Sequence, residues 1–423
     1  MRIPSPYINN ELNFSHFKKL LPFSLYALFP LSLFCIFLYP ITLTQPLFID
    51  RHSPLSPKDK CDYGNGKWVS DKMGPLYNDT SCETIKDGQN CINNGRPDTN
   101  YLYWRWRPHQ NQCKISRFNP MHFLSLTKNK HLAFIGDSMA RNQLESLLCM
   151  ISSFSQPILV YTSGYDNKFR RWNFPSYNLT ISIYWSPFLV KGIEKSDQSI
   201  NYNRLYLESV DETWASNIDY FDMVVLSVGH WFLHPAVYYY NGAVIGCHSC
   251  GVKNITEVGF YKVFGKAIKT SLETIIKRRG HQRSEGYFHA IVTTFSPHHF
   301  EGEWDKFGAC PKTRPLDEGE KDLEGMNMKM RKVAMNEIDL ARVKAKESSR
   351  KIRLEGLDVT KLALLRADGH PGPYMYANPF GNGIKERVQN DCVHWCMPGA
   401  IDTWNEILLE MMKSWHRDDK MAL

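Results

Sequence analysis

The chain has 423 residues, with 51 lysines and arginines against 43 aspartates and glutamates, which gives a formal net charge of +8. This basic excess is mild and dispersed, and its densest cluster, 329–332, falls in a segment with a helical pattern, where a solvated helix face explains it. We expect no nucleic-acid partner, because no nucleic-acid-binding motif accompanies these charges.

An uncharged, mostly apolar segment covers residues 20–49. A helix that spans a bilayer needs about 20 apolar residues, whereas the core of a signal peptide needs about 7–15. We predict a transmembrane signal anchor over 20–49, a cytosolic tail over 1–19 and a short stem over 50–60. Lys18 and Lys19 precede the anchor, which favours a cytosolic N-terminus. A long, cleaved signal peptide is the alternative.

Cysteine usage indicates an oxidising compartment for the rest of the chain. Cys35 lies in the predicted anchor and ten cysteines follow it, an even number that suggests disulfides. N-glycosylation sequons begin at Asn78, Asn178 and Asn254, on the same side of the anchor. These features predict a single-pass type II membrane protein with a lumenal body.

The body is long enough for one large domain or for a core with an appendage. Residues 61–118 are rich in Cys, Gly, Asn, Asp and Trp and predict a loop-rich, disulfide-stapled N-terminal subdomain. A second domain is predicted over 119–416, followed by a C-terminal tail over 417–423. Its strands alternate with helices, which predicts an α/β fold with a parallel sheet and helices on both faces. The predicted strands are 131–135, 221–228, 288–294 and 352–359, and the predicted helices are 138–150, 261–277, 322–346 and 400–415.

The first of these strands ends in a candidate nucleophile. Active sites of parallel α/β sheets lie beyond the carboxyl ends of the strands, and this strand runs into Gly136-Asp137-Ser138. Gly136 permits a tight turn, and the N-terminus of the next helix offers free N–H groups to a developing oxyanion. Ser138 is therefore placed like the serine of a nucleophile elbow. The competing interpretation is that Ser138 is only a helix N-cap.

A second motif near the C-terminus reads Asp391-Cys392-Val393-His394-Trp395-Cys396. On a helical turn Asp391 and His394 share a face, so the carboxylate can orient the imidazole as a general base. A serine, a histidine and a carboxylate are the groups that acyl transfer through a serine ester needs. His230, His298 and His299 are rival bases, which spacing alone does not rank.

Two further features admit several interpretations. Cys247-His248-Ser249-Cys250 has a C-x-x-C spacing that zinc sites use. A lumenal location favours disulfides over metal both there and at Cys392 and Cys396, so we expect no metal. Aromatic rings at 101–106 and at Trp185, Trp231 and Trp304 could stack on sugars, although most of them are expected to lie in the core.

Short runs extend these motifs over nearly everything after Cys61. They include Cys61-Asp62, Gly66-Lys67-Trp68-Val69, Pro75-Leu76-Tyr77, Cys91, Asn94-Gly95-Arg96-Pro97-Asp98, Trp104-Arg105-Trp106, the run from Ala133 to Gln143, Gly229-His230-Trp231, Ser296-Pro297, His299-Phe300, Asp368-Gly369-His370-Pro371 and the run from Asp391 to Gly399. Together they resemble the plant trichome birefringence-like proteins, which are Golgi polysaccharide O-acetyltransferases with paired GDS and DxxH motifs.

This resemblance implies an SGNH/GDSL-hydrolase-like core in a Golgi membrane protein. Ser138 would be the nucleophile, His394 the base and Asp391 its orienting acid. Gly229, Arg141 and Asn142 are further candidates for oxyanion or substrate contacts. No bound cofactor is implied, but an acetyl donor is required, either acetyl-CoA or an acetylated intermediate from a partner membrane protein. The implied disulfides are Cys61–Cys113, Cys82–Cys149, Cys91–Cys396, Cys310–Cys392 and Cys247–Cys250.

Three segments depart from the family pattern. Thr293-Thr294 stands where many relatives have an Arg before the Thr, Phe307-Gly308-Ala309-Cys310 replaces a more usual Gly-Gly pair, and Leu226-Ser227-Val228-Gly229 replaces Asn-Thr-Gly. These differences concern the oxyanion hole and the acceptor pocket rather than the nucleophile.

Three functions compete: acetyl transfer to a sugar hydroxyl, ester hydrolysis by the same three groups, and non-catalytic binding of wall polysaccharide. The resemblance and the anchor favour transfer. Segments 242–250 and 370–375 resemble the xyloglucan-acting branch, which implies a hemicellulose acceptor acetylated on its galactosyl side chains, at O-6 as the least hindered position. The Cys247–Cys250 insertion follows the strand that ends at Gly229, so we expect it to overhang the site and to shape an acceptor groove. Xylan, mannan and pectin are the alternative acceptors.

Overall fold

The computed structural model describes residues 61–195, 200–279, 286–348, 351–381, 383 and 387–421. The predicted cytosolic tail, signal anchor and stem therefore lie outside the described residues. Within the described ranges, no helix is both long and apolar enough to cross a bilayer. Residues 61–423 form one compact unit, so the predicted N-terminal subdomain and the second domain pack together.

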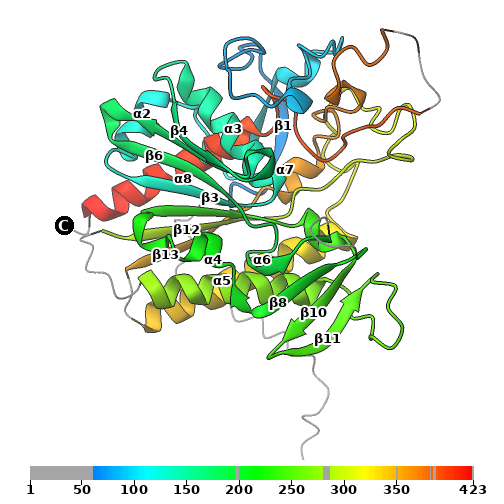
Figure 1. Cartoon of the computed structure of the whole chain (residues 1–423). Helices are drawn as coiled ribbons and strands as arrows, with labels where there is room; N and C mark the ends of the chain where they lie inside the picture. Colours follow the sequence, from blue (N-terminus) through cyan, green and yellow to red (C-terminus); the bar gives the residue numbers. More distant parts are fainter. Residues whose placement is uncertain are drawn as a thin grey trace, which may run out of the picture. The chain divides into compact units, whose positions relative to one another are not determined.

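A seven-stranded sheet forms the centre of this unit, in the order β13-β12-β9-β3-β6-β5-β4 (Figure 1). The five strands from β13 to β6 are parallel, whereas β5 and β4 run antiparallel to their neighbours. The parallel core and its four predicted strands are confirmed, but the complete sheet is mixed. The strands are β3 (His131–Gly136), β4 (Ile158–Ser163), β5 (Phe169–Phe174), β6 (Leu179–Trp185), β9 (Met223–Ser227), β12 (Phe288–Thr293) and β13 (Ile352–Leu357).

Helices cover both faces of the sheet, as predicted. On one face α2 (Pro120–Leu126), α3 (Ser138–Ser152) and α8 (Asp402–Met421) share a buried apolar core with the β3 residues Leu132 and Phe134. On the other face α5 (Tyr261–Arg279) and α6 (Gly325–Glu347) pack with Ala133 and Ile135. Successive side chains of a strand point to opposite faces, so β3 is buried on both sides.

The last helix is longer than predicted. It ends at Met421 rather than near residue 415, and so includes most of the segment predicted as a tail. Arg353 of β13 donates to the Asp419 carboxylate at 2.6 Å and to the Trp415 carbonyl at 3.2 Å. These contacts attach the final turns of α8 to the end of the sheet, a tertiary effect that periodicity alone does not reveal.

A second, four-stranded sheet has the order β11-β10-β8-β7 and shares the apolar core of α5. These strands are absent from the prediction: β7, β10 and β11 are short, with 4, 5 and 6 residues, whereas the alternating burial of β8 is a strand pattern that the prediction does not use. They are β7 (Val190–Ile193), β8 (Asn203–Val210), β10 (Ala236–Tyr240) and β11 (Ala243–His248). The remaining helices are α4 (Glu212–Ala215), α7 (Thr360–Leu364), η2 (Asp87–Gln89), η3 (Asn100–Leu102), η4 (Tyr165–Asn167), η5 (Pro175–Tyr177), η7 (Ile218–Tyr220), η8 (His230–Leu233) and η9 (Pro373–Met375).

The N-terminal segment is loop-rich, as predicted, around one antiparallel pair, β1 (Gly66–Ser70) and β2 (Trp104–Pro108). Trp68 and Trp106 meet edge to face, with ring centroids 5.5 Å apart, and join the apolar core of α3 and α8. The Trp68 indole N–H donates to the Leu362 carbonyl at 2.9 Å. The segment therefore contributes to the main core.

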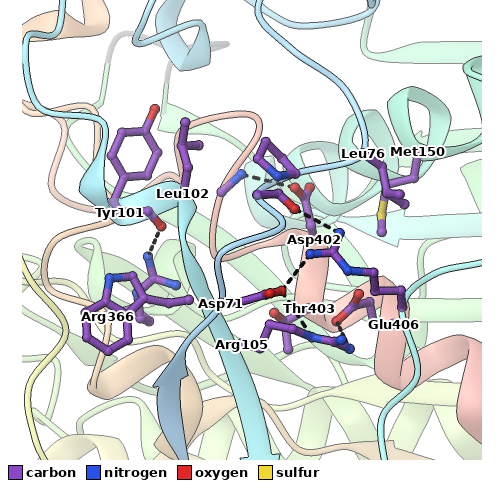
Figure 2. Close-up of a pocket in the computed structure, with 15 residues that line it drawn as sticks. Asp71, Leu76, Tyr101, Leu102, Arg105, Met150, Arg366, Asp402, Thr403 and Glu406 are labelled. Atoms are coloured by element: carbon purple, nitrogen blue, oxygen red, sulfur yellow. Dashed lines mark hydrogen bonds and ion pairs between the residues drawn. The ribbon is translucent and has the colours of Figure 1, made fainter.

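A small polar cavity lies between the N-terminal segment and α8 (Figure 2). Arg117 donates to Asp71 at 2.6 Å, and Arg105 lies 3.8 Å from Glu406 of α8. Burial raises the pKa of Glu406 to about 7, against the opposing charge of Arg105. The cavity measures about 50 Å³, which holds at most a few water molecules. The cavity is too small for a sugar, so we interpret the paired side chains that line it as a structural network.

Two histidines at the amino ends of strands, the buried His289 and the half-buried His131, predict acid sensitivity. Burial lowers the pKa of His289 to about 3 and that of His131 to about 4. Both stay neutral in the folded chain while the unfolded chain takes up protons below about pH 6.5. Stability is therefore present above pH 6.5 and lost as the pH falls towards 4, by up to about 1.4 kcal/mol per pH unit for each histidine.

We expect His289→Gln to make this loss shallower, because one fewer proton is taken up on unfolding. The measurement is the denaturant midpoint of the unchanged chain and the variant between pH 7 and pH 4. Exposed His416→Gln is the matched control. An identical pH slope for His289→Gln and the unchanged chain would contradict the assignment of a neutral buried His289.

Candidate active site

The turn between β3 and α3 presents Ser138 at the first position of the helix. A side chain at Gly136 would lie 1.9 Å from the Ser227 carbonyl oxygen, so only glycine fits this turn. Asp137 is the N-cap, and its carboxylate accepts the Met139 N–H at 2.9 Å. The interpretation of Ser138 as the N-cap is therefore wrong. Within the described residues its half-buried hydroxyl makes no hydrogen bond, and it remains available for chemistry.

Asp391 and His394 form the pair that their spacing predicts. One Asp391 oxygen accepts the His394 Nδ1–H at 2.7 Å, and the other accepts the backbone N–H groups of Val393 and His394 at 3.0 and 2.9 Å. One carboxylate thus closes the turn and orients the ring. The Nε2 atom of His394 is buried and has no hydrogen-bond partner in the described part of the chain, as a base awaiting a proton requires.

The two charges of this pair stabilise each other. Burial lowers the pKa of His394, but the charge of Asp391 and the hydrogen bond to it raise that pKa above its ordinary value. Burial likewise raises the pKa of Asp391, but His394 outweighs it and holds this pKa below the usual range. A positive charge on the His394 ring is therefore stabilised by Asp391.

Asn142 connects the helix that carries Ser138 to the turn that carries His394. It lies four residues after Ser138 on α3, and its side-chain carbonyl accepts the Trp395 N–H at 2.8 Å. Its amide group donates to the Trp395 carbonyl at 3.3 Å. The residue next to His394 is thereby docked on the first turns of α3. Asp137 and His394 also interact electrostatically, as neighbouring groups do.

The three residues suggested for oxyanion or substrate contacts all have protein partners. The Gly229 N–H donates to the Asp137 carboxylate at 3.1 Å, and Arg141 pairs with Asp166 at 2.9 Å. Asn142 holds Trp395, as described above. Gly229 and Asn142 thus serve the architecture of the site in this structure, whereas Arg141 borders a cavity beside it.

Asp137 has a role in the site that the Gly136-Asp137-Ser138 motif alone does not indicate. Its fully buried carboxylate joins the N-terminus of α3, through Met139, to the loop after β9, through Gly229. Burial raises the pKa of Asp137 to about 6, while these N–H groups and His394 oppose the rise. A charged residue between a glycine turn and a helix was the available signal, because such an acid either caps the helix or joins two loops.

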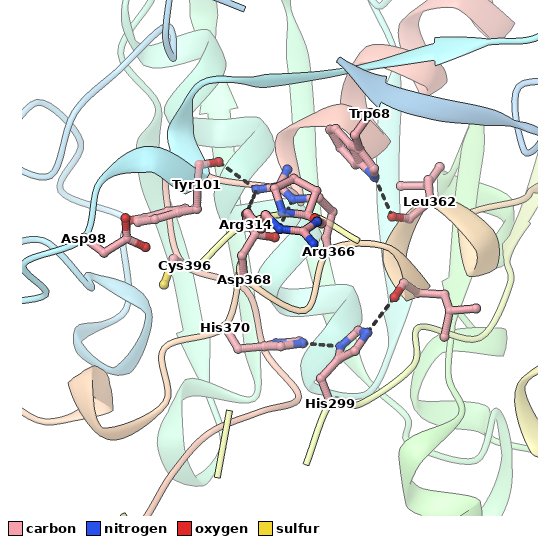
Figure 3. A network of polar contacts seen from close by, with 12 residues as sticks. Trp68, Asp98, Tyr101, His299, Arg314, Leu362, Arg366, Asp368, His370 and Cys396 are labelled. Atoms are coloured by element: carbon pink, nitrogen blue, oxygen red, sulfur yellow. Dashed lines mark hydrogen bonds and ion pairs between the residues drawn. The ribbon is translucent and has the colours of Figure 1, made fainter. Parts of the chain in front are cut away.

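The rival bases have other partners. His230 donates from Nε2 to the Ser296 carbonyl at 2.9 Å, and burial lowers its pKa to about 3. Burial also lowers the pKa of His298. The His299 ring lies against His370, with 2.7 Å between Nδ1 and Nε2, and its own Nε2 donates to the Leu364 carbonyl at 2.8 Å (Figure 3).

His370 connects this histidine pair to the catalytic turn. Its Nδ1 lies 2.7 Å from the His394 carbonyl oxygen, and its ring stacks on Trp395 with centroids 4.3 Å apart. Arg96 donates to the carbonyl groups of Asp368 and His370 at 2.7 and 2.8 Å, and so holds the segment that carries this histidine. His370 therefore contacts the backbone of His394, and Arg96, which is distant in the sequence, holds the segment that carries His370.

Disulfides brace the same turn and agree with the five pairings implied by the resemblance. Cys392 is bonded to Cys310 and Cys396 to Cys91, on either side of His394. The other pairs are Cys61–Cys113, Cys82–Cys149 and Cys247–Cys250. No cluster of three or more metal-binding side chains occurs among the described residues.

The expected overhang of the Cys247–Cys250 insertion receives no support from its contacts. Strand β11 pairs with β10, and Cys247 exchanges backbone hydrogen bonds with the strand-like segment 256–258. The hairpin lies beside β8 at the lower right of Figure 1. Of the aromatic candidates, Trp185 and Trp231 are half-buried and in mutual contact, whereas Trp304 is 56% exposed.

Comparison with known proteins gives matches over almost the whole chain. The PC-Esterase model, described as a GDSL/SGNH-like acyl-esterase family found in Pmr5 and Cas1p, matches residues 115–411, and the PMR5 N-terminal domain matches residues 59–114. Xyloglucan O-acetyltransferase 1 of Populus trichocarpa is 58% identical over 417 residues, which cover 96% of each chain.

Two relatives from Arabidopsis thaliana extend this comparison. Xyloglucan O-acetyltransferase 1 is 58% identical over 356 residues, covering 84% of this chain and 81% of the relative. Protein trichome birefringence-like 25 is 41% identical over 380 residues, covering 88% of this chain and 81% of the relative.

We predict that Asn142→Ala weakens the site by undocking the catalytic turn. The substitution leaves the buried N–H and C=O groups of Trp395 unpaired, at about 1–3 kcal/mol each. We expect lower stability and at least a tenfold slower reaction of Ser138 with a fluorophosphonate probe, measured by mass spectrometry. Exposed Asn93→Ala is the control. An unchanged labelling rate in Asn142→Ala would show that the docking does not serve Ser138.

Proposed function

Since the chain belongs to the GDSL/SGNH-like acyl-esterase family found in Pmr5 and Cas1p and is a polysaccharide O-acetyltransferase, we propose that it acetylates xyloglucan through an ester of Ser138. The observation that carries the mechanism is the Asp391–His394 pair, whose free Nε2 belongs to a turn docked on the helix of Ser138. Ser138, His394 and Asp391 would then be the nucleophile, the base and the orienting acid of serine acyl transfer.

In the first step, His394 Nε2 takes the hydroxyl proton of Ser138 while the serine oxygen attacks the acetyl carbonyl carbon of the donor. The bond between that carbon and the leaving group then breaks, and the imidazolium returns the proton to the leaving group. The first turn of α3 has N–H groups without helical partners, and its dipole favours a negative charge. It therefore suits the oxyanion of the tetrahedral intermediate.

In the second step, His394 removes a proton from a sugar hydroxyl, whose oxygen attacks the acetyl group on Ser138. The ester bond to Ser138 breaks, and the serine oxygen recovers the proton from the imidazolium. Water in place of the sugar would give hydrolysis, which is the esterase alternative. Two of the relatives are named as xyloglucan O-acetyltransferases, which favours a sugar hydroxyl over water as the acceptor.

We further propose that the acceptor position is O-6 of galactosyl side chains, the primary and least hindered hydroxyl. The donor is acetyl-CoA or an acetylated intermediate supplied by a membrane protein. The xyloglucan named in the relatives supports the acceptor polymer. Xylan, mannan and pectin are the acceptors to be tested against it.

We place the protein in the Golgi membrane with its body in the lumen. Five disulfides in the body suit an oxidising compartment. The sequon asparagines Asn78, Asn178 and Asn254 are all exposed, so each is accessible for glycosylation. The uncharged run 20–49 is long enough for an anchor.

The nucleophile is tested by Ser138→Ala. We expect the variant to fold and to lose at least about 10⁴-fold in transfer, because the covalent step has no oxygen to carry it. Mass spectrometry of the unchanged chain with labelled donor should find acetyl on the peptide that contains Ser138. Near-normal turnover by Ser138→Ala would refute the acetyl-serine mechanism.

The acceptor is tested by offering xyloglucan, xylan, mannan and pectin oligosaccharides separately with labelled acetyl donor. We expect label on galactosylated xyloglucan, at O-6 by NMR, and none on the same oligosaccharide after galactosidase treatment. Label on xylan but not on xyloglucan would overturn the acceptor and leave the transfer mechanism standing.

The topology is tested by protease protection of microsomes that contain the full chain. We expect the body to be protected until detergent is added, and to lose mass on treatment with a glycosidase that removes N-glycans. Digestion of the body in intact microsomes would contradict a lumenal location.

A further inference from the structure

A cavity of about 340 Å³ opens beside α3, where Arg141 and Glu145 line it. Its walls are α3, the β4–β5 hairpin and residues 83–86 of the N-terminal segment. Arg141 lines it and lies three residues after Ser138, on the same side of the helix and about 4.5 Å further along its axis. Lys86 lines the cavity as well and interacts electrostatically with His394. The cavity therefore lies along the first turns of α3, on the side that carries Arg141.

The charges on the walls of the cavity neutralise one another. The lining holds three cationic side chains and three carboxylates, so its net charge is zero. Asp166 pairs with Arg141 at 2.9 Å and with Lys86 at 3.2 Å, and Glu145 pairs with Arg170 at 2.5 Å. Phosphate groups bind where guanidinium or ammonium groups are free. This lining therefore disfavours a polyanion such as coenzyme A.

The lining also holds polar groups that a ligand can reach. The Lys86 ammonium is a donor and the Asp166 carboxylate is an acceptor, and their side chains are 44% and 53% exposed. Sugar hydroxyls both donate and accept, so they match walls that hold donors and acceptors together. Leu159, which is 52% exposed, adds an apolar surface for the C–H groups of a sugar ring.

We propose that this cavity is an acceptor subsite, which binds an uncharged sugar residue next to the one that receives acetyl. The inference rests on the proposed function and specifies where its acceptor is held. The volume lies at the lower end of the range for small-molecule sites, about 300–1,000 Å³, as suits a short part of a branched chain. A sugar bound here would hold a neighbouring hydroxyl within reach of acetyl-Ser138.

Two substitutions on β4 test the subsite. Leu159→Trp places an indole in the cavity, whereas Val160→Trp adds the same group to a neighbouring residue of similar exposure, 49% against 52%, that does not line it. Both positions are half-exposed, so both variants should fold, which thermal unfolding checks. The full-length chain in detergent is assayed with a galactosylated xyloglucan oligosaccharide and labelled acetyl donor.

We expect Leu159→Trp to raise the KM for the oligosaccharide at least tenfold and Val160→Trp to change it less than twofold. Equal KM values for the two variants would overturn the subsite. A rise in the KM for the acetyl donor instead would reassign the cavity to the donor.

A binding measurement separates this inference from the proposed function. In a Ser138→Ala background, titration calorimetry with the same oligosaccharide, without donor, should show at least tenfold weaker binding when Leu159→Trp is added. Unchanged affinity would overturn the subsite whatever the turnover data show. Failure of the unchanged chain to transfer acetyl to any sugar would instead refute the proposed function, while the affinities would still decide whether the cavity binds sugar.

Discussion

The site depends on the docking of the Asp391–His394 turn against the first turns of α3, which Asn142 makes through both backbone groups of Trp395. In the proposed mechanism a nucleophile and its base must keep their relative position to within about 0.5 Å, and the two segments that carry them lie about 250 residues apart in the sequence. The two Asn142 hydrogen bonds join those segments directly. Asp137 then fixes the loop after β9 against the same helix end.

Several independent contacts hold the turn itself, and together they make it rigid. Asp391 closes it from within, two disulfides hold it on either side, and His370 holds the His394 carbonyl from behind. Several of these groups are buried and polar, so each would be costly if its partner were missing. The pairing of the Asp391 carboxylate and of the Trp395 backbone groups therefore favours the observed arrangement of the turn.

The sequence predicted the parts of this structure that are local. The run before Gly136 is continuously apolar and the helix after it is periodic, so the elbow at Ser138 follows from patterning, and the i,i+3 spacing of Asp391 and His394 predicts their contact. The roles of Asn142, Asp137 and His370 depend on partners 24 to 253 residues away, which no local pattern encodes. The second sheet was missed for a related reason, since its short strands are stabilised by the core of α5 rather than by their own composition.

The Cys91–Cys396 bond closes a loop of 305 residues, and this has a consequence for biosynthesis. A chain emerging from the ribosome exposes Cys91 long before Cys396 exists, so the early thiol must stay unpaired, or pair reversibly, until nearly the whole chain has been made. The covalent framework around His394 is thus completed only at the end of translation. A chain terminated anywhere before Cys396 would carry an orphan thiol in its N-terminal segment, a mark by which an oxidising compartment can distinguish unfinished molecules from finished ones.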